Sequence, residues 1–366
     1  MKILLIEPFF SGSHKSWAEG FQESSDNDID ILSLEGKFWK WRMRGGAITL
    51  ARKFNSSNLK PDLILVTDML DLTTFLSLTR KKTYNIPTVI YFHENQFSYP
   101  SSKTDSNQKN NIQKHYGFIN YSSALVADHI LFNSNFHQKS FIKDLESFLR
   151  NAPDHNELET LRNIDKKSHV LYLGLDLKRF DNFKTNKNKK PLLLWNHRWE
   201  YDKDPESFFK ILFKLKNDKV NFELAILGEN HQSIPSVFNL AKDILSKEIV
   251  HFGYCDSFDE YARWLWKADI LPVTNIQDFF GISIMEAIYC NTYPLLPKRL
   301  TYPELLHKQY HPNNLYSNED DLYNKLKNSI INIEKIRKLT FNIIAQPYDW
   351  SSMKNQYDEL FLSFIK

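Results

Sequence analysis

The sequence predicts an α/β protein of two doubly wound domains, in each of which helices cover both faces of a parallel sheet. Short, continuous apolar runs alternate with longer amphipathic stretches, as expected of parallel strands that are buried on both faces. After Asp176 the chain becomes polar and lysine-rich, and a new apolar run at 192–195 restarts the alternation. Such a change of composition marks a domain boundary, and a length of 366 residues suits two domains.

The apolar runs give the expected strands. In the first half they cover residues 3–7, 29–34, 63–67, 88–93, 129–133 and 170–173, and in the second half 192–195, 222–227, 249–252, 270–274 and 292–296. We therefore expect one domain at 1–178 and another at 190–346. Within the first domain, the Asn-, Ser- and Lys-rich residues 103–113 are expected to form a loop.

The composition excludes several kinds of protein. The formal net charge is only +3, so a nucleic-acid partner would need a local basic patch. Cys255 and Cys290 are the only cysteines, which excludes a disulfide scaffold and a cysteine-rich metal site. No apolar run approaches the roughly 18–20 residues that span a bilayer. We therefore expect a cytoplasmic protein with no stable membrane association.

The stretch D-F-F-G-I-S-I-M-E, from Asp278 to Glu286, is the strongest candidate for a functional site. It joins a predicted strand to a helix that opens on Gly281, so the unpaired N–H groups of the first turn face a ligand. Those groups favour an anion such as phosphate, while the two flanking carboxylates can accept hydrogen bonds from ribose or sugar hydroxyls. The alternative is an ordinary strand–turn–helix, with Asp278 as a capping residue and Glu286 on a solvated face.

Polar residues also follow two strands of the first domain. Gly12, flanked by serines, enters a helix near His14, although the full G-x-G-x-x-G spacing is missing. The alternative there is a plain turn with Ser13 as the N-cap. His93 and Glu94 follow the fourth strand, at the edge where parallel sheets build their sites. For His93 the alternative is a structural role.

Residues 37–44, which we call the basic–aromatic segment, interleave cations with large aromatic side chains. The cations are Lys37, Lys40, Arg42 and Arg44, and the aromatic residues are Phe38, Trp39 and Trp41. Basic groups fit phosphates and aromatic faces stack bases, so the segment is a candidate nucleic-acid surface. The alternative is a helix start with aromatic residues in the core and cations in solvent.

The acid-x7-acid pattern around F-G-I-S, followed by E-A-I-Y-C-N-T-Y-P-L-L-P, resembles the donor site of retaining glycosyltransferases with the GT-B fold. That group includes sucrose synthase and many mannosyltransferases. This chain differs in having Asp278 where the family usually has glutamate. It also has Asn291 where glycine is common, although asparagine tolerates the same left-handed conformation. The resemblance implies two Rossmann-like domains with a cleft between them, a hinge near Gly174, and a final helix, 347–366, that returns to the first domain.

The same resemblance implies roles for single residues. Arg198 and Lys203 would stabilise the charge that grows on a leaving diphosphate, and His93 would contact the transferred sugar. The expected catalytic residues are His93, Arg198, Lys203 and Asp278; the expected donor-binding residues are Gly12, Ser13, Gly228, Gly253, Tyr254, Phe280, Gly281, Ile282, Ser283 and Glu286. The expected acceptor-binding residues are Lys40, Trp41, Arg42, Arg44, Glu94, Asn95 and His115. Asp202 and Asp204 spell D-x-D before Pro205, and we interpret them as a helix cap and not as a metal site.

Four segments together indicate one family within this group of glycosyltransferases. They are K-W-R-M-R-G-G, Y-F-H-E-N-Q-F-S-Y-P, N-H-R-W-E-Y-D-K-D-P and F-F-G-I-S-I-M-E-A-I. They are similar to the tRNA-queuosine mannosyltransferases over nearly the whole chain. This implies transfer of mannose from GDP-mannose, with retention, onto the cyclopentenediol of queuosine in the anticodon of aspartate tRNA. The expected partners are a nucleotide sugar and a tRNA that carries queuosine, with no cofactor and no metal. The sequence leaves the oligomeric state open.

Two other functions fit the same residues. One is a GT-B transferase that acts on a lipid or polysaccharide, for which an exposed basic and apolar helix near the acceptor site would be expected. The other is a non-catalytic protein that binds a nucleotide sugar or RNA, a possibility raised by Asp278. Hydrolysis of the donor in the absence of acceptor would separate an enzyme from a binding protein.

Overall fold

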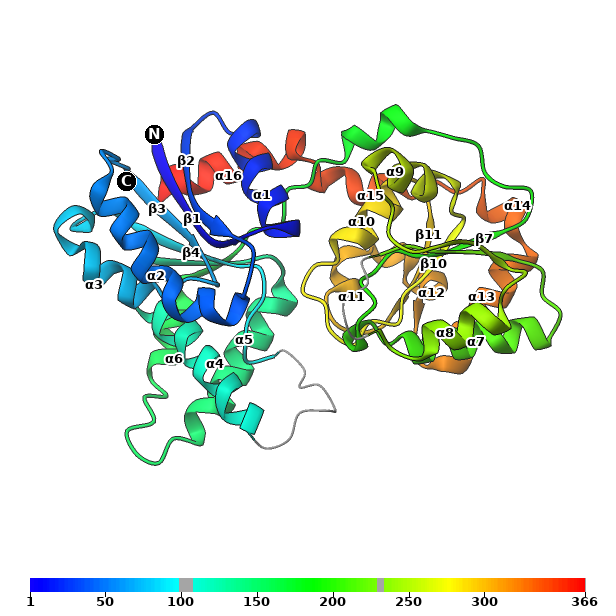
Figure 1. Ribbon diagram of the computed structural model, residues 1–366, viewed down its shortest axis with the longest axis horizontal. Helices are drawn as coiled ribbons and strands as arrows, with labels where there is room; N and C mark the ends of the chain where they lie inside the picture. Colours follow the sequence, from blue (N-terminus) through cyan, green and yellow to red (C-terminus); the bar gives the residue numbers. More distant parts are fainter. Residues whose placement is uncertain (99–107, 229–233, 366) are drawn as a thin grey trace. The chain divides into compact units, whose positions relative to one another are not determined.

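The computed structural model describes residues 1–98, 108–228 and 234–365 and divides the chain into two compact units (Figure 1). The first unit consists of Met1–Asp176 together with Trp350–Lys366, and the second of Leu177–Asp349. The chain therefore enters the second unit just before the lysine-rich segment. The last helix is part of the first unit.

In the described part of the first unit, six parallel strands form one sheet in the order β2-β1-β3-β4-β5-β6. The strands are β1 (Lys2–Phe10), β2 (Asp28–Glu35), β3 (Leu63–Thr67), β4 (Thr88–Phe92), β5 (His129–Phe132) and β6 (Ser168–Val170). The helices are α1 (Gly12–Ser24), α2 (Trp39–Ser56), α3 (Leu72–Thr83), α4 (Gln108–Val126), α5 (Asn135–Arg150), α6 (Thr160–Lys166) and α16 (Trp350–Ser363).

Two details differ from the sequence prediction. The strand expected at 170–173 instead covers Ser168–Val170, so residues 171–173 lie outside it; β6 lies at the sheet edge, where polar residues are tolerated. The loop expected at 103–113 is helical from Gln108 onward, so that part of the prediction is wrong. Residues 103–107 lie outside the described residues.

Helices α2 to α6 cover one face of this sheet, and α1 and α16 cover the other (Figure 1). On the second face, the Trp17 ring lies 4.8 Å from that of Tyr91, and its Nε1 donates a hydrogen bond to the Tyr357 hydroxyl at 3.0 Å. The Phe21 ring lies 5.4 Å from that of Phe361 in α16. The last helix of the chain thus completes the core of the first unit.

The described part of the second unit repeats the architecture, with strand order β12-β11-β10-β7-β8-β9. The strands are β7 (Leu192–Trp195), β8 (Glu223–Ile226), β9 (Ile249–Phe252), β10 (Ile270–Pro272), β11 (Tyr293–Pro297) and β12 (Leu315–Tyr316). The α-helices are α7 (Pro205–Asn217), α8 (Val237–Ile244), α9 (Phe258–Lys267), α10 (Ile282–Tyr289), α11 (Tyr302–Leu305), α12 (His311–Asn314), α13 (Glu319–Ile331), α14 (Ile333–Ile336) and α15 (Asn342–Ala345). Short 3₁₀ helices are η1 (Lys178–Phe183), η2 (Tyr201–Lys203), η3 (Lys308–Tyr310) and η4 (Gln346–Tyr348). The sequence missed β12, because two apolar residues between polar neighbours form no run.

The predicted fold class, two doubly wound parallel α/β domains, is confirmed. In the first unit the strand order reverses between β1 and β3, and in the second between β7 and β10. Ligands of doubly wound sheets bind outside the carboxyl ends of the strands at such a reversal. The candidate residues are therefore sought at these two places.

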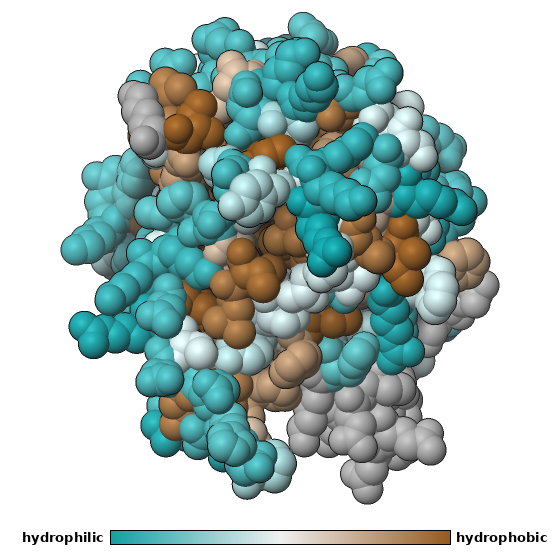
Figure 2. All heavy atoms as spheres, turned by 90° about the vertical axis from the view of Figure 1, so that its left-hand side faces the viewer, coloured by the Kyte–Doolittle hydropathy of each residue, from teal (hydrophilic) through white to brown (hydrophobic). Residues whose placement is uncertain are grey.

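Figure 2 shows one face of the molecule, where hydrophilic residues predominate and apolar residues lie in patches among them. Within residues 1–98, 108–228 and 234–365, no helix combines the length and the apolar character needed to cross a membrane.

Two glycines of the first unit make room for Trp350. A Cβ atom at Gly174 would lie 2.3 Å from the Trp350 ring, and one at Gly20 would lie 2.1 Å from it. The backbone N–H of Trp350 donates to the Leu175 carbonyl at 2.9 Å. Close packing, and not only the flexibility expected of a hinge, therefore accounts for glycine at position 174.

We predict that Gly174→Ala destabilises the first unit by about 1–3 kcal/mol, because the new methyl group overlaps the Trp350 ring. Urea unfolding measures this change. The matched control is Gly46→Ala in α2, where a Cβ would meet its nearest neighbour at 3.4 Å and helix propensity favours alanine. Equal stabilities for the two variants would contradict the packing role.

Candidate active site

The predicted anion-binding turn of the second unit lies between β10 and α10. Gly281 is the N-cap residue of α10 and has φ 89°, a left-handed conformation that favours glycine. A Cβ there would lie 3.1 Å from Ile284 and 3.3 Å from the Asp278 carboxylate. The structure thus confirms that glycine is needed at this position. Asn291, after the same helix, also has a left-handed φ, 61°.

Asp278 is held by two residues that the sequence did not single out. Asn275 Nδ2 and the Tyr302 hydroxyl each donate to its Oδ2 at 3.0 Å. Arg299 braces the same loop, because its guanidinium donates to the carbonyls of Thr274 and Asn275. The side chain of Asp278 caps no helix, so the capping alternative is wrong. Its carboxylate is instead oriented within a fixed loop.

Glu286 faces the protein interior and not solvent, so the solvated-face alternative is also wrong. Its side chain is 14% exposed, its Oε2 accepts a hydrogen bond from the Tyr261 hydroxyl at 2.7 Å, and its Oε1 lies 3.7 Å from the Arg179 guanidinium. The two carboxylates of the acid-x7-acid pattern are therefore both fixed by neighbouring side chains.

The two predicted cations of the second unit have different environments. Arg198 is about half exposed and lies 3.3 Å from Glu200. Lys203 is 13% exposed; its Nζ lies 3.0 Å from Asp202 Oδ2 and donates to the Gln277 carbonyl at 3.1 Å. Lys203 thus connects the end of β7 with the loop that carries Asp278. A largely buried cation at this point can stabilise a nearby anion strongly, because little water screens it.

Residues at the end of β7 brace the first turn of α10. Asn196 Nδ2 donates to the Ser283 carbonyl at 2.7 Å, and His197 Nδ1 lies 3.2 Å from Ser283 Oγ. Burial and the charge of Lys203 lower the pKa of His197 to about 3, so this ring is neutral at pH 7. Asp204 caps α7 through the Ser207 N–H, which confirms the helix-cap interpretation of D-x-D.

Two predicted strand-end glycines adopt left-handed conformations, with φ 110° at Gly228 and 134° at Gly253. A Cβ at Gly228 would lie 2.0 Å from the His197 carbonyl oxygen, so strand packing requires glycine there. Tyr254, which follows Gly253, is 65% exposed. Phe280 is buried, so only its backbone can meet a donor, while Ile282 is partly accessible.

In the first unit, α1 begins at Gly12, which has φ 50°. Ser11 is the N-cap residue, and Ser13 lies within the first turn, so the alternative in which Ser13 is the N-cap is wrong. Gly12 and Ser13 are exposed. His14, which follows them, is only partly accessible.

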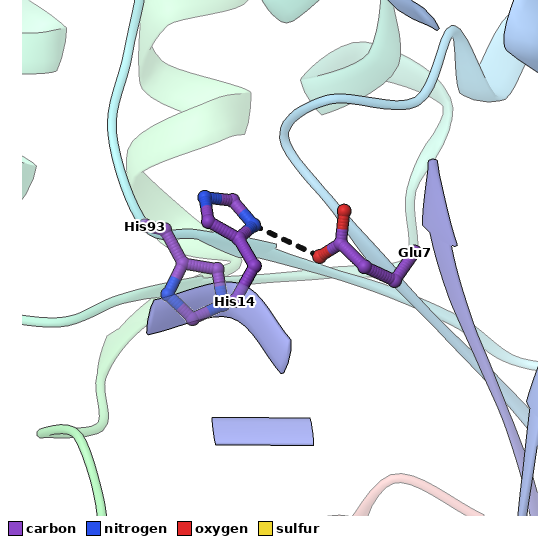
Figure 3. A group of neighbouring side chains, drawn as sticks. All are labelled: Glu7, His14 and His93. Atoms are coloured by element: carbon purple, nitrogen blue, oxygen red, sulfur yellow. Dashed lines mark hydrogen bonds and ion pairs between the residues drawn. The ribbon is translucent and has the colours of Figure 1, made fainter. Parts of the chain in front are cut away.

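Glu7, His14 and His93 form a buried polar group at the carboxyl ends of β1 and β4 (Figure 3). Glu7 is fully buried, and its Oε2 lies 2.9 Å from His14 Nδ1. The rings of His14 and His93 lie 4.5 Å apart. Burial lowers the pKa of His14, but the charge and hydrogen bond of Glu7 outweigh it and raise the pKa to about 9. Burial and the His14 charge hold the pKa of His93 well below its usual range.

Asp68 and Asn95 are both fully buried and accept hydrogen bonds from the backbone next to this group. Asp68 Oδ1 accepts the His93 N–H at 2.9 Å, and the Asp68 carbonyl accepts from Asn120 Nδ2 at 2.9 Å. Asn95 Oδ1 accepts the N–H groups of Phe97 and Ser98, so Asn95 holds this turn. The sequence missed Glu7, His14 and Asp68; the one signal for Asp68 was an acid directly after a strand.

The basic–aromatic segment opens α2, and its aromatic residues are not in the core. Phe38 is 77% exposed and Trp41 63% exposed, so the core alternative is wrong for them. Arg44 lies over the Tyr116 ring of α4, 5.2 Å from its centre, and the exposed His115 lies beside that ring. The segment and His115 thus lie on either side of the Tyr116 ring.

Two groups in the described residues offer three ligand atoms each to a metal ion: Glu7, His14 and His93, and His251, Cys255 and Glu260. In the first group, Glu7 and His14 already bond to each other. In the second, His251 Nε2 lies 3.1 Å from the Gly253 carbonyl, which fixes that nitrogen as a donor and not as a ligand. Burial raises the pKa of Cys255 to about 12, which disfavours the thiolate that binds metal.

Comparisons with known proteins find matches to both units of the chain. Residues 2–175 match the family model of the tRNA-queuosine alpha-mannosyltransferase N-terminal domain, and residues 178–346 match that of the glycosyl transferases group 1. A tRNA-queuosine alpha-mannosyltransferase of Drosophila melanogaster is 33% identical over 341 residues, which are 89% of this chain and 86% of the relative.

Solved structures show the same fold. Sucrose-phosphate synthase from Thermosynechococcus elongatus has a TM-score of 0.72 at 12% identity, covering 99% of this chain and 98% of its own. HepE from Anabaena, in complex with UDP, has a TM-score of 0.66 at 15% identity, covering 99% and 100%. The fold is therefore GT-B, as expected from the sequence.

We predict that the imidazole of His14 titrates at about pH 9 and that Glu7→Gln lowers its pKa, because burial is then opposed only by the charges of Asp68 and Glu94. Imidazole NMR titration measures both values. Since the folded-state pKa is raised, the ion pair contributes its full stability below pH 6.5 and loses it as the pH rises through 9. Titration near 6.5 in both proteins would contradict the ion pair.

Proposed function

This chain belongs to the tRNA-queuosine alpha-mannosyltransferase family, and on that premise we propose that it transfers mannose from GDP-mannose, with retention, onto the cyclopentenediol of queuosine in the anticodon of aspartate tRNA. The observation that carries the proposal is the 33% identity over 89% of the chain, because it includes both units. The glycosyltransferase group 1 match supports the second unit as the donor domain.

Donor binding is assigned to the second unit. Lys203, Arg198 and the N-terminus of α10 supply positive charge for the diphosphate, whose negative charge grows as it leaves. Asp278 and Glu286 are fixed carboxylates that can accept hydrogen bonds from hydroxyls of the sugar and the ribose. The exposed Tyr254 offers a ring for the base. We propose that no metal takes part, since these groups provide the charge.

The chemical step follows from the same arrangement. Retention without an enzyme nucleophile requires that the attacking hydroxyl approach on the face from which the diphosphate leaves. The departing phosphate oxygen then accepts the proton of that hydroxyl as the new bond forms. The enzyme supplies position and charge stabilisation. His93, which is neutral at pH 7 because its pKa is lowered, can hydrogen-bond a sugar hydroxyl without adding charge.

Acceptor binding is assigned to the first unit. The exposed basic–aromatic segment presents cations for tRNA phosphates and two large rings, Phe38 and Trp41, for stacking with bases. Arg44 and His115 extend the same surface. A lipid acceptor also predicts an exposed basic and apolar helix near the acceptor site, so transfer to tRNA is compared directly with transfer to lipid extracts.

The test of the function is incubation of the protein with GDP-mannose and tRNA, with and without queuosine. Mass analysis of the nucleosides should find one added hexose on queuosine and none on guanosine. Lys203→Ala should lower turnover about 100-fold or more without unfolding the protein, whereas the surface variant Lys214→Ala should not. Transfer to lipid extracts, or no transfer at all, would reject the proposal.

We further predict that replacing Arg42 and Arg44 together with alanine weakens tRNA binding and flattens its salt dependence by roughly one unit of log–log slope per lost phosphate contact. Trp41→Ala should cost about 1–3 kcal/mol of binding if the ring stacks a base. Affinity for GDP-mannose should stay unchanged. Filter binding at several salt concentrations measures the effect.

The matched control removes two cations from another surface of the same unit, Arg80 and Lys81 at the end of α3. If this control weakens tRNA binding as much as the Arg42 and Arg44 double variant does, the surface acts only through its general charge. The basic–aromatic segment would then not be the acceptor surface.

A further inference from the structure

The buried polar group of the first unit carries more negative than positive charge. Glu7, Asp68 and Glu94 place three carboxyl groups where His14 supplies one imidazolium, since all three act on its charge. His93 is neutral at pH 7 because its pKa lies well below its usual range. The net negative charge of the group would therefore stabilise one further positive charge.

Unpartnered polar atoms point to a missing ligand. Asp68 Oδ2 and His93 Nε2 are buried and have no hydrogen-bond partner among the described residues. The Asp68 carboxyl cannot turn away, because the His93 N–H holds its other oxygen at 2.9 Å. Burial and the charge of Glu94 raise the pKa of Asp68 to about 8, against the opposing charge of His14, so at pH 7 this carboxyl is mostly protonated and ionises only when a cation binds beside it. An anion at this place is costly until a cation or a donor joins it.

The proposed acceptor has the complementary chemistry. Queuosine joins its deazaguanine ring to the cyclopentenediol through a secondary amine, which is protonated at neutral pH. The ligand thus carries one positive charge beside two hydroxyls. Guanosine at the same position of a tRNA has neither feature.

We propose that this buried group recognises the secondary ammonium of the acceptor nucleoside. Glu94 contacts the ammonium. Asp68 lies behind the ammonium, and its ionised carboxylate balances the positive charge. His93 lies beside the diol. The inference rests on the proposed function and deepens it. Glu94 and His93 are partly accessible, whereas Asp68 is fully buried and acts as a positioning residue. Glu94 is itself oriented, because its Oε1 accepts from Gln96 Nε2 at 3.1 Å.

A metal ion fits the same atoms less well. Glu7 and His14 would have to give up their mutual hydrogen bond to become ligands. A phosphate fits worse, because the surplus charge is negative. The first unit therefore separates two tasks: the basic–aromatic segment binds tRNA phosphates, and the buried acidic group binds the modified base.

The experiment compares the full-length protein's affinity for one tRNA in two forms. One form carries guanine at the acceptor position, and the other carries deazaguanine with an aminomethyl group, which has the ammonium but no diol. Neither form can accept mannose, so binding is measured apart from catalysis. The wild type should prefer the aminomethyl form about tenfold, as for a charge-assisted hydrogen bond.

Glu94→Gln and Asp68→Asn should abolish this preference, which is measured as the ratio of the two affinities within each variant. Glu19→Gln, which removes a surface carboxylate from α1, is the matched control and should keep it. If Asp68→Asn does not fold, Glu94→Gln at the partly accessible position decides the question.

Equal affinity of the wild type for the two tRNAs would overturn the inference, as would a preference that survives in Glu94→Gln. The proposed function fails separately, if the wild type does not transfer mannose to the same tRNA carrying queuosine. Transfer without discrimination would leave the function standing and remove only the ammonium site.

Discussion

A parallel sheet covered on both faces leaves polar side chains few places to lie. In the central strands β3, β4 and β7 every side chain is buried, so a charged group there would lose its water without gaining a partner. At the carboxyl ends the strands open into loops and helix N-termini, where N–H groups and polar side chains can pair. This constraint places Asp278, Lys203, Glu7 and His93 at strand ends, and Glu7 fits because His14 pairs with it.

At the carboxyl ends of their strands, the two units carry buried groups of opposite charge. In the second unit a largely buried Lys203 and a helix N-terminus collect positive charge, and the two carboxylates are fixed by Tyr302 and Tyr261. In the first unit the buried groups are mainly acidic, and cations lie outside, on the basic–aromatic segment. The net charge of +3 is a sum over the whole chain and does not show this division.

The fold could be predicted from the sequence because buried parallel strands appear as apolar runs, and these runs do not depend on tertiary contacts for their recognition. The sequence predicted the turn at Gly281 because a left-handed residue before a helix demands glycine. It did not find Tyr302 or Arg299, whose contacts with the loop depend on tertiary placement and leave no local pattern. Glu7 was visible only as a charge that interrupts an apolar run, and its partner His14 showed nothing of the ion pair.

Helix α16 also determines when the first unit can be completed during translation. The side chains of Trp350, Tyr357 and Phe361 that cover one face of its sheet are made after the whole second unit. On the ribosome, the nascent first unit therefore keeps Phe21 and Tyr91 without their final cover while residues 177–349 are synthesised. The nascent chain has to be shielded over this interval, by chaperones or by the ribosome surface. A stalled chain would expose an apolar face, which quality control can recognise.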